Sequence, residues 1–436
     1  MSAVLDSYVE AVRSVDLCRR RGRVTSLIGL VIEATGLEAE VGELCTIDAG
    51  RDKPPVAAEV VGFRERRTLL MPLGEMHGIG PGNAVSATGA SVRLPVGEEL
   101  LGRVLDGLGR PIDSLEPPVT DEQRPAFAPP PSPLERRRIT ERLSLGVRSL
   151  DGFVPVGLGQ RLGIFAGSGV GKSSLLGMIA RSASADVNVI CLVGERGREV
   201  REFIERDLGD AISRSVVIVA TSDEAPLLRI KAALAATTVA EWFRDQGKEV
   251  LLMMDSVTRL ATAQRELGLA IGEPPAARGY TPSVFTLLPR LLERAGTSAV
   301  GSITGLYTVL VDGDDMTDPV ADAVRSILDG HCVLSRELAH RNHYPAVDVL
   351  QSVSRLTGEV TSPEHRAAAA AIRELLAVHR EKSDLISIGA YAPGSDERVD
   401  RAIALMPEIE AFLRQSIDEH VPAATSDGEL VQLAAS

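Results

Sequence analysis

The chain has 436 residues, of which 44% are hydrophobic and 25% charged, a composition typical of a folded globular protein. Its net charge of −13 makes the chain as a whole a poor ligand for nucleic acid or an anionic membrane. No apolar run approaches the roughly 18 residues that a membrane-spanning helix needs, and the amino terminus is unlike a secretory signal. Four widely separated cysteines indicate buried thiols in a reducing, cytosolic compartment.

The first third of the chain changes character twice. Residues 1–20 carry apolar side chains at helical spacing, which predicts an amphipathic helix. Residues 21–95 contain short β-branched runs separated by Gly, Pro and Asp, which predicts a small β-barrel with strands near 27–32, 44–47, 58–63 and 68–71. Residues 96–135 are rich in proline, including three in succession, so we expect an extended linker along a surface.

Strands and helices alternate over residues 136–356. Apolar strands are expected at 162–166, 187–193, 216–220 and 250–254, with helices at 172–183 and 226–244. Strands that are apolar on both faces and alternate with helices predict an α/β domain whose parallel sheet is covered by helices. Residues 357–436 are expected to form a helical domain, with helices at 364–382 and 396–419 and a frayed tail beyond Pro422.

One glycine-rich loop carries the strongest chemical signal. The sequence AGSGVGKS at 166–173 stands between a predicted strand and a predicted helix, where backbone N–H groups and the helix N-terminus can bind phosphate. Lys172 would reach the outer phosphates of ATP, and the Ser173 hydroxyl would bind Mg²⁺. The nucleotide-binding residues predicted here are Ser168, Gly169, Val170, Gly171, Lys172, Ser173 and Ser174.

Two carboxylates follow other strands of the same domain. Asp255 ends the apolar run 250–254, where a ligand for Mg²⁺ or its water belongs, although the same residue can cap the next helix. Glu195 follows the strand at 187–193, near the expected position of the γ-phosphate. From chemistry alone Glu199 and Glu202 compete with Glu195 for the role of orienting the attacking water.

Long stretches of the chain resemble a known family. AGSGVGKS, GERGREV, LLMMDSVTR, PPAARGYTPSVFTLLPRLLERAG, GSITGLYTVLVDGDDMTDP and HYPAVDVLQSVSR resemble, in order, the hexameric ATP-synthase superfamily. GYTPSVFTLLPRLLERAG and DGHCVLSRELAHRNHYPAVD are similar to its type III secretion branch. RRRGRVTSLIGLVIEATGL and ISIGAYAPGSD, near the two ends, resemble the flagellar export ATPases within that branch.

The resemblance implies a fold and assigns catalytic roles. It implies an N-terminal β-barrel, a RecA-like P-loop domain and a helical C-terminal domain. Glu195 would orient the hydrolytic water, since Glu at this position marks catalytic subunits. Arg355 would be an arginine finger offered to the γ-phosphate of a neighbouring subunit. Arg196 and Arg259 would lie near the phosphates.

The resemblance also implies a site for the adenine ring. Tyr344, in HYPAVD, matches the aromatic residue that packs on the ring, and Tyr391, in GAYAPG, would close the other side unless it belongs to the core. Ala166 replaces the first glycine of the general loop pattern, a departure that is common in export ATPases.

The implied activity is Mg²⁺-dependent ATP hydrolysis in a homohexamer, serving protein export. The implied partners are a stalk-like regulator at residues 1–20, export chaperones with their substrates, and membrane export-gate proteins, but no nucleic acid. The implied location is the cytoplasm, peripheral to the inner membrane. The alternatives are an injectisome ATPase, an ATP-synthase catalytic subunit, a RecA-like nucleic-acid translocase and a non-catalytic scaffold.

Overall fold

The computed structural model describes residues 21–50, 53–311, 313 and 315–436. The predicted helix at 1–20 and Cys18 therefore lie outside the described residues. The described part of the chain divides into two compact units, a smaller one formed mainly by residues up to 93 and a larger one that contains most of the residues from 94 to 436. None of the described helices combines the length and the apolar character needed to cross a bilayer.

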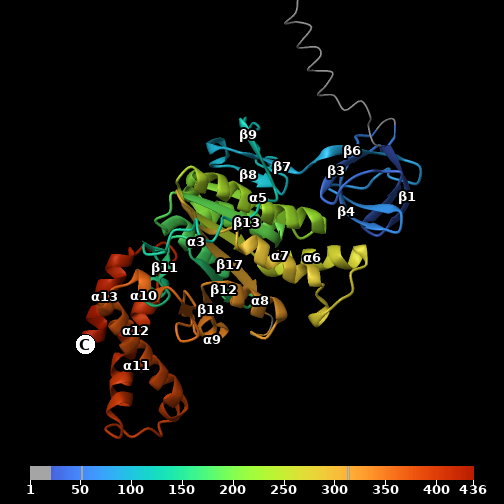
Figure 1. The fold of residues 1–436 in the computed structure, drawn as a ribbon. Helices are drawn as coiled ribbons and strands as arrows, with labels where there is room; N and C mark the ends of the chain where they lie inside the picture. Colours follow the sequence, from blue (N-terminus) through green and yellow to red (C-terminus); the bar gives the residue numbers. More distant parts are fainter. Residues whose placement is uncertain (1–20, 51–52, 312, 314) are drawn as a thin grey trace, which may run out of the picture. The chain divides into compact units, whose positions relative to one another are not determined.

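The smaller unit contains a closed barrel with strand order β1-β2-β5-β4-β3-β6 (Figure 1). Alternate residues point into it, so Val24, Ile32, Ile47 and Val60 form its core. The run predicted as one strand at 27–32 is instead a hairpin, because Gly29 has φ 59° and turns the chain. The strands are β1 (Arg21–Ile28), β2 (Val31–Thr35), β3 (Glu43–Ile47), β4 (Val56–Arg64), β5 (Arg67–Pro72) and β6 (Ala84–Ser91).

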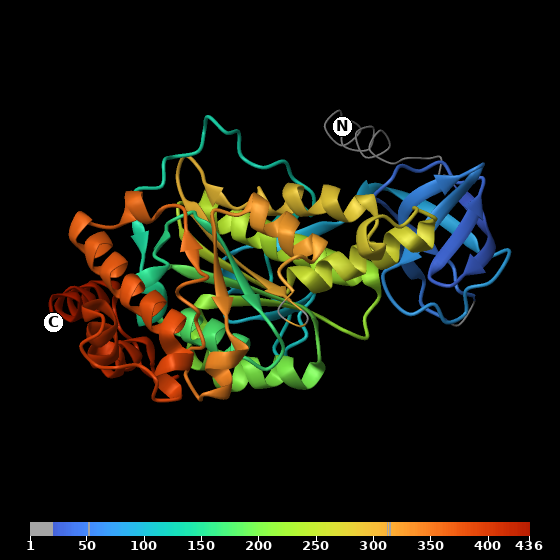
Figure 2. The ribbon, with the colours of Figure 1, turned by 90° about the horizontal axis from the view of Figure 1, so that it is seen from below.

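The larger unit is built on a nine-stranded sheet with the order β19-β18-β12-β17-β15-β13-β14-β8, in which β16 pairs with β17. Pairing is parallel except at β19 and β16, and helices lie on both sides of the sheet (Figure 2). The predicted α/β class is confirmed. The strands are β8 (Val104–Asp106), β12 (Arg161–Ala166), β13 (Val187–Glu195), β14 (Ser215–Thr221), β15 (Glu249–Asp255), β16 (Gly296–Thr297), β17 (Ser302–Leu310), β18 (Gly330–Leu334) and β19 (Val353–Ser354).

The segment 96–135, predicted as an extended linker from its prolines, contributes strands to the larger unit. It contributes β8, which pairs in parallel with β14 and completes one edge of the sheet. Further along, β9 (Glu122–Pro125) pairs with β7 (Arg93–Val96). Arg124 donates to Asp245 at the end of α5 (Pro226–Asp245). The segment is therefore an anchored part of the larger unit, because its polar side chains find partners on the helix layer.

Short elements and helices complete the larger unit. The remaining strands are β10 (Arg142–Leu143) and β11 (Val156–Gly157), which pair with each other. Besides α5, the helices before the carboxyl-terminal region are α2 (Arg148–Phe153), α3 (Lys172–Ser182), α4 (Gly197–Glu202), α6 (Val257–Ile271), α7 (Pro282–Leu292), α8 (Pro319–Ile327) and α9 (Arg336–His340). The buried cysteines Cys45, Cys191 and Cys332 carry free thiols, as predicted.

The carboxyl-terminal region is helical, but two of its predicted boundaries are wrong. It contains α10 (Thr357–Val360), α11 (Pro363–Ser387), α12 (Glu397–Leu413) and α13 (Ala423–Ala435), and the last three lie together (Figure 1). The second predicted helix stops at Leu413 rather than 419, and the tail predicted to fray forms α13. Ser426, Leu430 and Leu433 recur at helical spacing, and the buried face that they share packs against α11 and α2.

Candidate active site

The phosphate loop joins β12 to α3 as predicted. Gly171 is the N-cap of α3 and adopts a left-handed conformation, with φ 89°, which glycine reaches without strain. Val170 is buried in the core, whereas Ser168 and Gly169 are exposed. Ser173 is also exposed, at the start of α3, where the helix dipole and free N–H groups favour an anion.

Three charged side chains that the sequence spreads over 84 positions, from 172 to 255, meet beside this loop. The Lys172 ammonium contacts Asp255 Oδ1 and lies 3.6 Å from Glu195 Oε1. β15, which ends in Asp255, pairs with β13, which ends in Glu195, so their carboxyl ends lie at one edge of the sheet. The contacts bring together a cation suited to phosphate and two carboxylates suited to a metal ion and a water.

The environment of Glu195 favours its protonated form. Burial above all, together with the negative charge of Asp255, raises the pKa of Glu195 to about 7, although Lys172 opposes the rise. Glu199 also interacts with Glu195 and contributes to the increase. A carboxyl group whose pKa lies near neutrality is suited to exchange a proton with water during a reaction.

The neighbouring charged residues are more exposed than Glu195. Arg196 is 79% exposed in its side chain, and its guanidinium lies 3.4 Å from Glu199. Glu202 pairs with Arg198 on the exposed surface of α4. The Arg259 side chain packs against Gly194, where an added Cβ would approach it to 3.0 Å. Of the three competing carboxylates, only Glu195 contacts Lys172.

A pocket of about 650 Å³ opens beside the phosphate loop. Tyr344 lines it with 41% of its surface exposed, and its ring lies 3.3 Å from the position of a Cβ on Gly171. Residues 414–417, directly after α12, also line it. Gln415 fixes this segment, because its N–H donates to the Tyr344 carbonyl at 3.0 Å.

Tyr391 is not among the residues that line this pocket; it packs against the core, the alternative that the sequence left open. Its hydroxyl lies 3.0 Å from both the Asp396 carbonyl and the Asp400 carboxylate, and these contacts hold it against the start of α12. Residues 414–417 were not predicted as part of the pocket, because the helix predicted at 396–419 includes them, whereas α12 ends at Leu413. A signal was present in Ser416 and Ile417, where the apolar helical spacing of α12 breaks off.

Arg355 lies far from the phosphate loop of its own chain. It follows β19 at the sheet edge, is exposed, and its N–H donates to the Asp329 carbonyl at 3.0 Å. Asp329 donates in turn to the carbonyl of Arg161, which begins β12, whereas the phosphate loop follows the end of β12. The strand separates the two positions by about 17 Å, at roughly 3.3 Å per residue.

The donor set beside the loop fits Mg²⁺. This ion prefers oxygen ligands and usually keeps waters while binding one or two protein groups together with phosphate oxygens. The Asp255 carboxylate and the Ser173 hydroxyl are ligands of this type. Among the described residues, no group of three or more His, Cys, Asp and Glu side chains is arranged to hold a metal ion.

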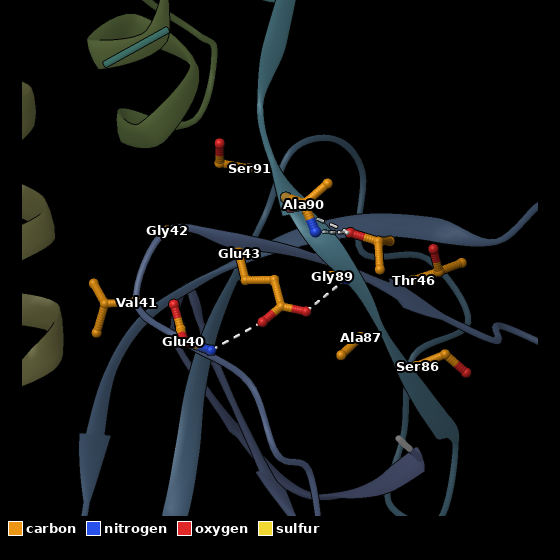
Figure 3. Close-up of a pocket in the computed structure, with 11 residues that line it drawn as sticks. Glu40, Val41, Gly42, Glu43, Thr46, Ser86, Ala87, Gly89, Ala90 and Ser91 are labelled. Carbon is orange, nitrogen blue, oxygen red and sulfur yellow. Dashed lines mark hydrogen bonds between the residues drawn. The ribbon is translucent and has the colours of Figure 1, made fainter. Parts of the chain in front are cut away.

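A second hollow, of about 800 Å³, lies on the barrel between β3 and β6 (Figure 3). Small side chains of β6 line it, and Glu43 spans it, accepting hydrogen bonds from the N–H groups of Glu40 and Gly89. None of the predicted site residues lines this hollow.

The geometry defines a class of protein: a P-loop nucleotide-binding enzyme with a β-barrel before its parallel sheet and helices after it. The family model described as "ATP synthase alpha/beta family, nucleotide-binding domain" matches residues 146–354. The model of the β-barrel domain of the same family matches residues 24–89. The "T3SS EscN ATPase C-terminal domain" matches residues 361–432. The chain belongs to the ATP synthase alpha/beta family.

Relatives of the chain are similar over nearly its whole length. It is 53% identical to the flagellum-specific ATP synthase of Bacillus subtilis, with 95% of each chain covered. It is 50% identical to a type 3 secretion system ATPase of Xanthomonas euvesicatoria, covering 92% of this chain and 91% of the relative. The assembled ATPase EscN of enteropathogenic E. coli has a TM-score of 0.90 at 46% identity, over 95% of this chain and 100% of EscN.

Proposed function

We propose that this protein is a Mg²⁺-dependent ATPase that serves flagellar type III protein export. The observation that carries the proposal is the meeting of Lys172, Asp255 and Glu195 beside the phosphate loop. The relatives support the flagellar role over the alternatives, because full-length flagellum-specific ATP synthases reach 53% identity. An injectisome role is the second candidate, supported by the 50% identity to a secretion ATPase.

The chain's own residues supply positioning and charge for the reaction. Lys172, together with the amides of the loop from Ser168 to Ser174, would hold the phosphates. Ser173 and Asp255 would bind Mg²⁺, which supplies charge neutralisation on the phosphate oxygens when bound. Glu195 would orient the attacking water and take up its proton, for which its raised pKa suits it.

The adenine ring would bind in the pocket beside Tyr344. One face of the ring would rest on the tyrosine, and the segment 414–417 would close the other side. Tyr391 has no place in this assignment. Arg196 is 79% exposed and lies 3.4 Å from Glu199, and we assign to it contact with the phosphates when nucleotide and a neighbouring subunit are bound.

Arg355 is assigned to the γ-phosphate of a neighbouring subunit. The strand between Arg355 and its own phosphate loop is longer than an arginine side chain can span, so a finger at this position must act in trans. An arginine finger contributes about 10³–10⁵ in rate. The assembled form of EscN supports a ring, which for this chain we propose to be a homohexamer.

The test is ATPase activity per subunit over a wide range of protein concentration, with Arg355→Ala alongside. We expect activity to rise steeply with concentration and to be lost in the variant, whose nucleotide affinity is retained. A preformed ring would give a flat curve, but the variant would still be inactive. Full activity in Arg355→Ala would refute the finger in trans and the ring that it requires.

The proposed partners follow from the same relatives. EscN has been solved in complex with its central stalk EscO, which supports a stalk-like regulator for this chain. We assign residues 1–20 to regulator docking, and export chaperones, their substrates and export-gate proteins to the assembled ring, at the cytoplasmic face of the inner membrane. Deletion of residues 1–20 should abolish binding of the regulator and leave nucleotide binding intact. Undiminished regulator binding would contradict this assignment.

A further inference from the structure

Thr308 is a buried hydroxyl in the centre of the sheet that the reaction described above does not use. It lies near the carboxyl end of β17, the strand between β12, which leads into the phosphate loop, and β15, which ends in Asp255. The register sets Thr308 opposite Ile164 of β12, two residues before the loop begins. The residue is fully buried among apolar neighbours such as Leu306 and Val309. A hydroxyl in such a place needs a hydrogen-bond partner.

The hydrogen-bond partner of the Thr308 hydroxyl is the Asp255 carboxylate. The Thr308 hydroxyl lies 2.7 Å from Asp255 Oδ1 and 3.3 Å from the Met254 carbonyl, and its single proton goes to the closer, charged oxygen. A hydrogen bond to an ionised acceptor at this distance is among the stronger ones in proteins. Lys172 contacts the same atom, Oδ1. Both contacts therefore fix one oxygen of Asp255 and leave Oδ2 as the other possible ligand.

These two partners of Asp255 differ in what happens when nucleotide binds. Lys172 belongs to the phosphate loop, and in the proposed function its ammonium goes to the phosphates. Thr308 is held in a strand that is paired on both sides, so its hydroxyl stays in place. Its β-branched side chain also has a restricted χ1 angle. Thr308 is thus the partner that can keep Asp255 oriented in the loaded site.

We propose that Thr308 is a positioning residue that holds the Asp255 carboxylate in the orientation needed to bind Mg²⁺ with the nucleotide. This inference rests on the proposed function, in which Asp255 is a ligand for the metal. Partners that orient a metal ligand are worth about 10–100-fold in metal affinity. Loss of the hydroxyl should therefore weaken the response of the protein to Mg²⁺, while nucleotide binding without metal is retained.

The test uses the full-length chain and the variants Thr308→Val and Thr308→Ser. Valine keeps the shape and removes the hydroxyl, whereas serine keeps the hydroxyl. Thr304→Val is the matched control, because Thr304 is equally buried on the same face of β17 but accepts from the Gly159 N–H instead. The measurement is binding of the fluorescent, non-hydrolysable analogue mant-AMP-PNP, in EDTA and over a Mg²⁺ titration.

We expect Thr308→Val to bind the analogue in EDTA as the unsubstituted protein does and to need about ten-fold more Mg²⁺ for half-maximal binding. Thr308→Ser should stay close to the unsubstituted protein, and Thr304→Val should leave the Mg²⁺ requirement unchanged. An unchanged requirement in Thr308→Val would overturn the proposal, as would an equal loss in Thr304→Val. If Thr308→Val does not fold, Thr308→Ala removes the hydroxyl with less bulk and carries the same test.

The same experiment separates this inference from the proposed function. If the unsubstituted protein neither hydrolyses ATP nor responds to Mg²⁺, the proposed function fails. If it does both and Thr308→Val behaves identically, only the role of Thr308 fails.

Discussion

Replacing Arg294 by methionine is expected to destabilise the larger unit by about 3–5 kcal/mol, the usual cost of breaking a buried ion pair from one side. Arg294 is almost fully buried and donates two hydrogen bonds to the Glu241 carboxylate, at 2.8 and 2.6 Å. It also donates to the Ala126 carbonyl and to the Thr238 hydroxyl, each at 2.9 Å. One side chain thus joins the segment that follows α7 to α5 and to the proline-rich segment.

The magnitude follows from what the substitution leaves behind. Methionine has a similar length but no charge and no donor, so Glu241, only 5% exposed, would lose both hydrogen bonds from the guanidinium. The Ala126 carbonyl would lose one of its two donors and keep the Thr238 hydroxyl, so most of the cost comes from the carboxylate of Glu241. The double variant Arg294→Met with Glu241→Leu removes both charges and should recover much of the loss, because the two residues are coupled.

The chain contains its own reporter for this measurement. Trp242 is the single tryptophan, and it stands next to Glu241 on α5. Its indole N–H donates to Glu122 at 2.8 Å, within the same segment that Arg294 anchors. Urea unfolding followed by tryptophan fluorescence therefore reports on this unit alone. The free energy of unfolding comes from linear extrapolation, if the transition is cooperative.

Two results would refute this reasoning. One is a loss below about 1 kcal/mol in Arg294→Met, the range of an exposed pair rather than a buried one. The other is additivity, in which the double variant loses as much as the two single variants together, since that would mean the two side chains do not interact.

Four further outcomes are expected at the site. Glu195→Gln should keep nucleotide affinity and lose about 10²–10⁴ in turnover, measured by phosphate release, because the amide cannot take up a proton; retained turnover would contradict the role. Turnover of the unsubstituted protein should rise as pH increases through about 7, since burial and Asp255 raise the pKa of Glu195 and only the carboxylate accepts a proton; a profile flat around neutrality would argue against it. Gly171→Ala should weaken nucleotide binding about ten-fold or more, because its φ of 89° strains an alanine and the Cβ meets Tyr344; an unchanged Kd would show that the loop tolerates the strain. Tyr391→Phe should leave the KM for ATP unchanged and slightly lower the melting temperature, since the hydrogen bonds that are lost join Tyr391 to Asp396 and Asp400 and not to the pocket; a raised KM would show that Tyr391 contributes to the nucleotide pocket.

The sequence was sufficient to predict those elements whose conformation depends only on the residues of one short segment. The phosphate loop is such a segment, because glycine at 171 satisfies a backbone conformation that the loop itself requires. The apolar runs of β13 and β15 indicated buried parallel strands for the same reason. The β-barrel also followed from its short runs, although the hairpin at Gly29 was missed, because one continuous apolar stretch hid the turn.

Other features depend on partners that are distant in the chain. The proline-rich segment is predicted as a linker because prolines exclude helix. Its own residues do not indicate that β8 pairs with β14 or that the Ala126 carbonyl accepts a hydrogen bond from Arg294. The last helix, α13, was predicted to fray because its residues are small and polar, yet its narrow apolar face is covered by α11 and α2. Helix stability in proteins comes mainly from such packing.

The sequence by itself determined the chemistry of the site: which residues can bind phosphate, hold a metal ion and activate water. It did so because side-chain type and loop conformation are local properties. The tertiary structure decided which of these groups meet. It set Glu195 rather than Glu202 beside Lys172 and gave Asp255 its second partner in Thr308. It also decided between the two roles open to Tyr391, which packs against the core, and placed the segment 414–417 in the wall of the pocket. Those choices depend on strand order and on where a helix ends, which are fixed by the packing of the whole unit.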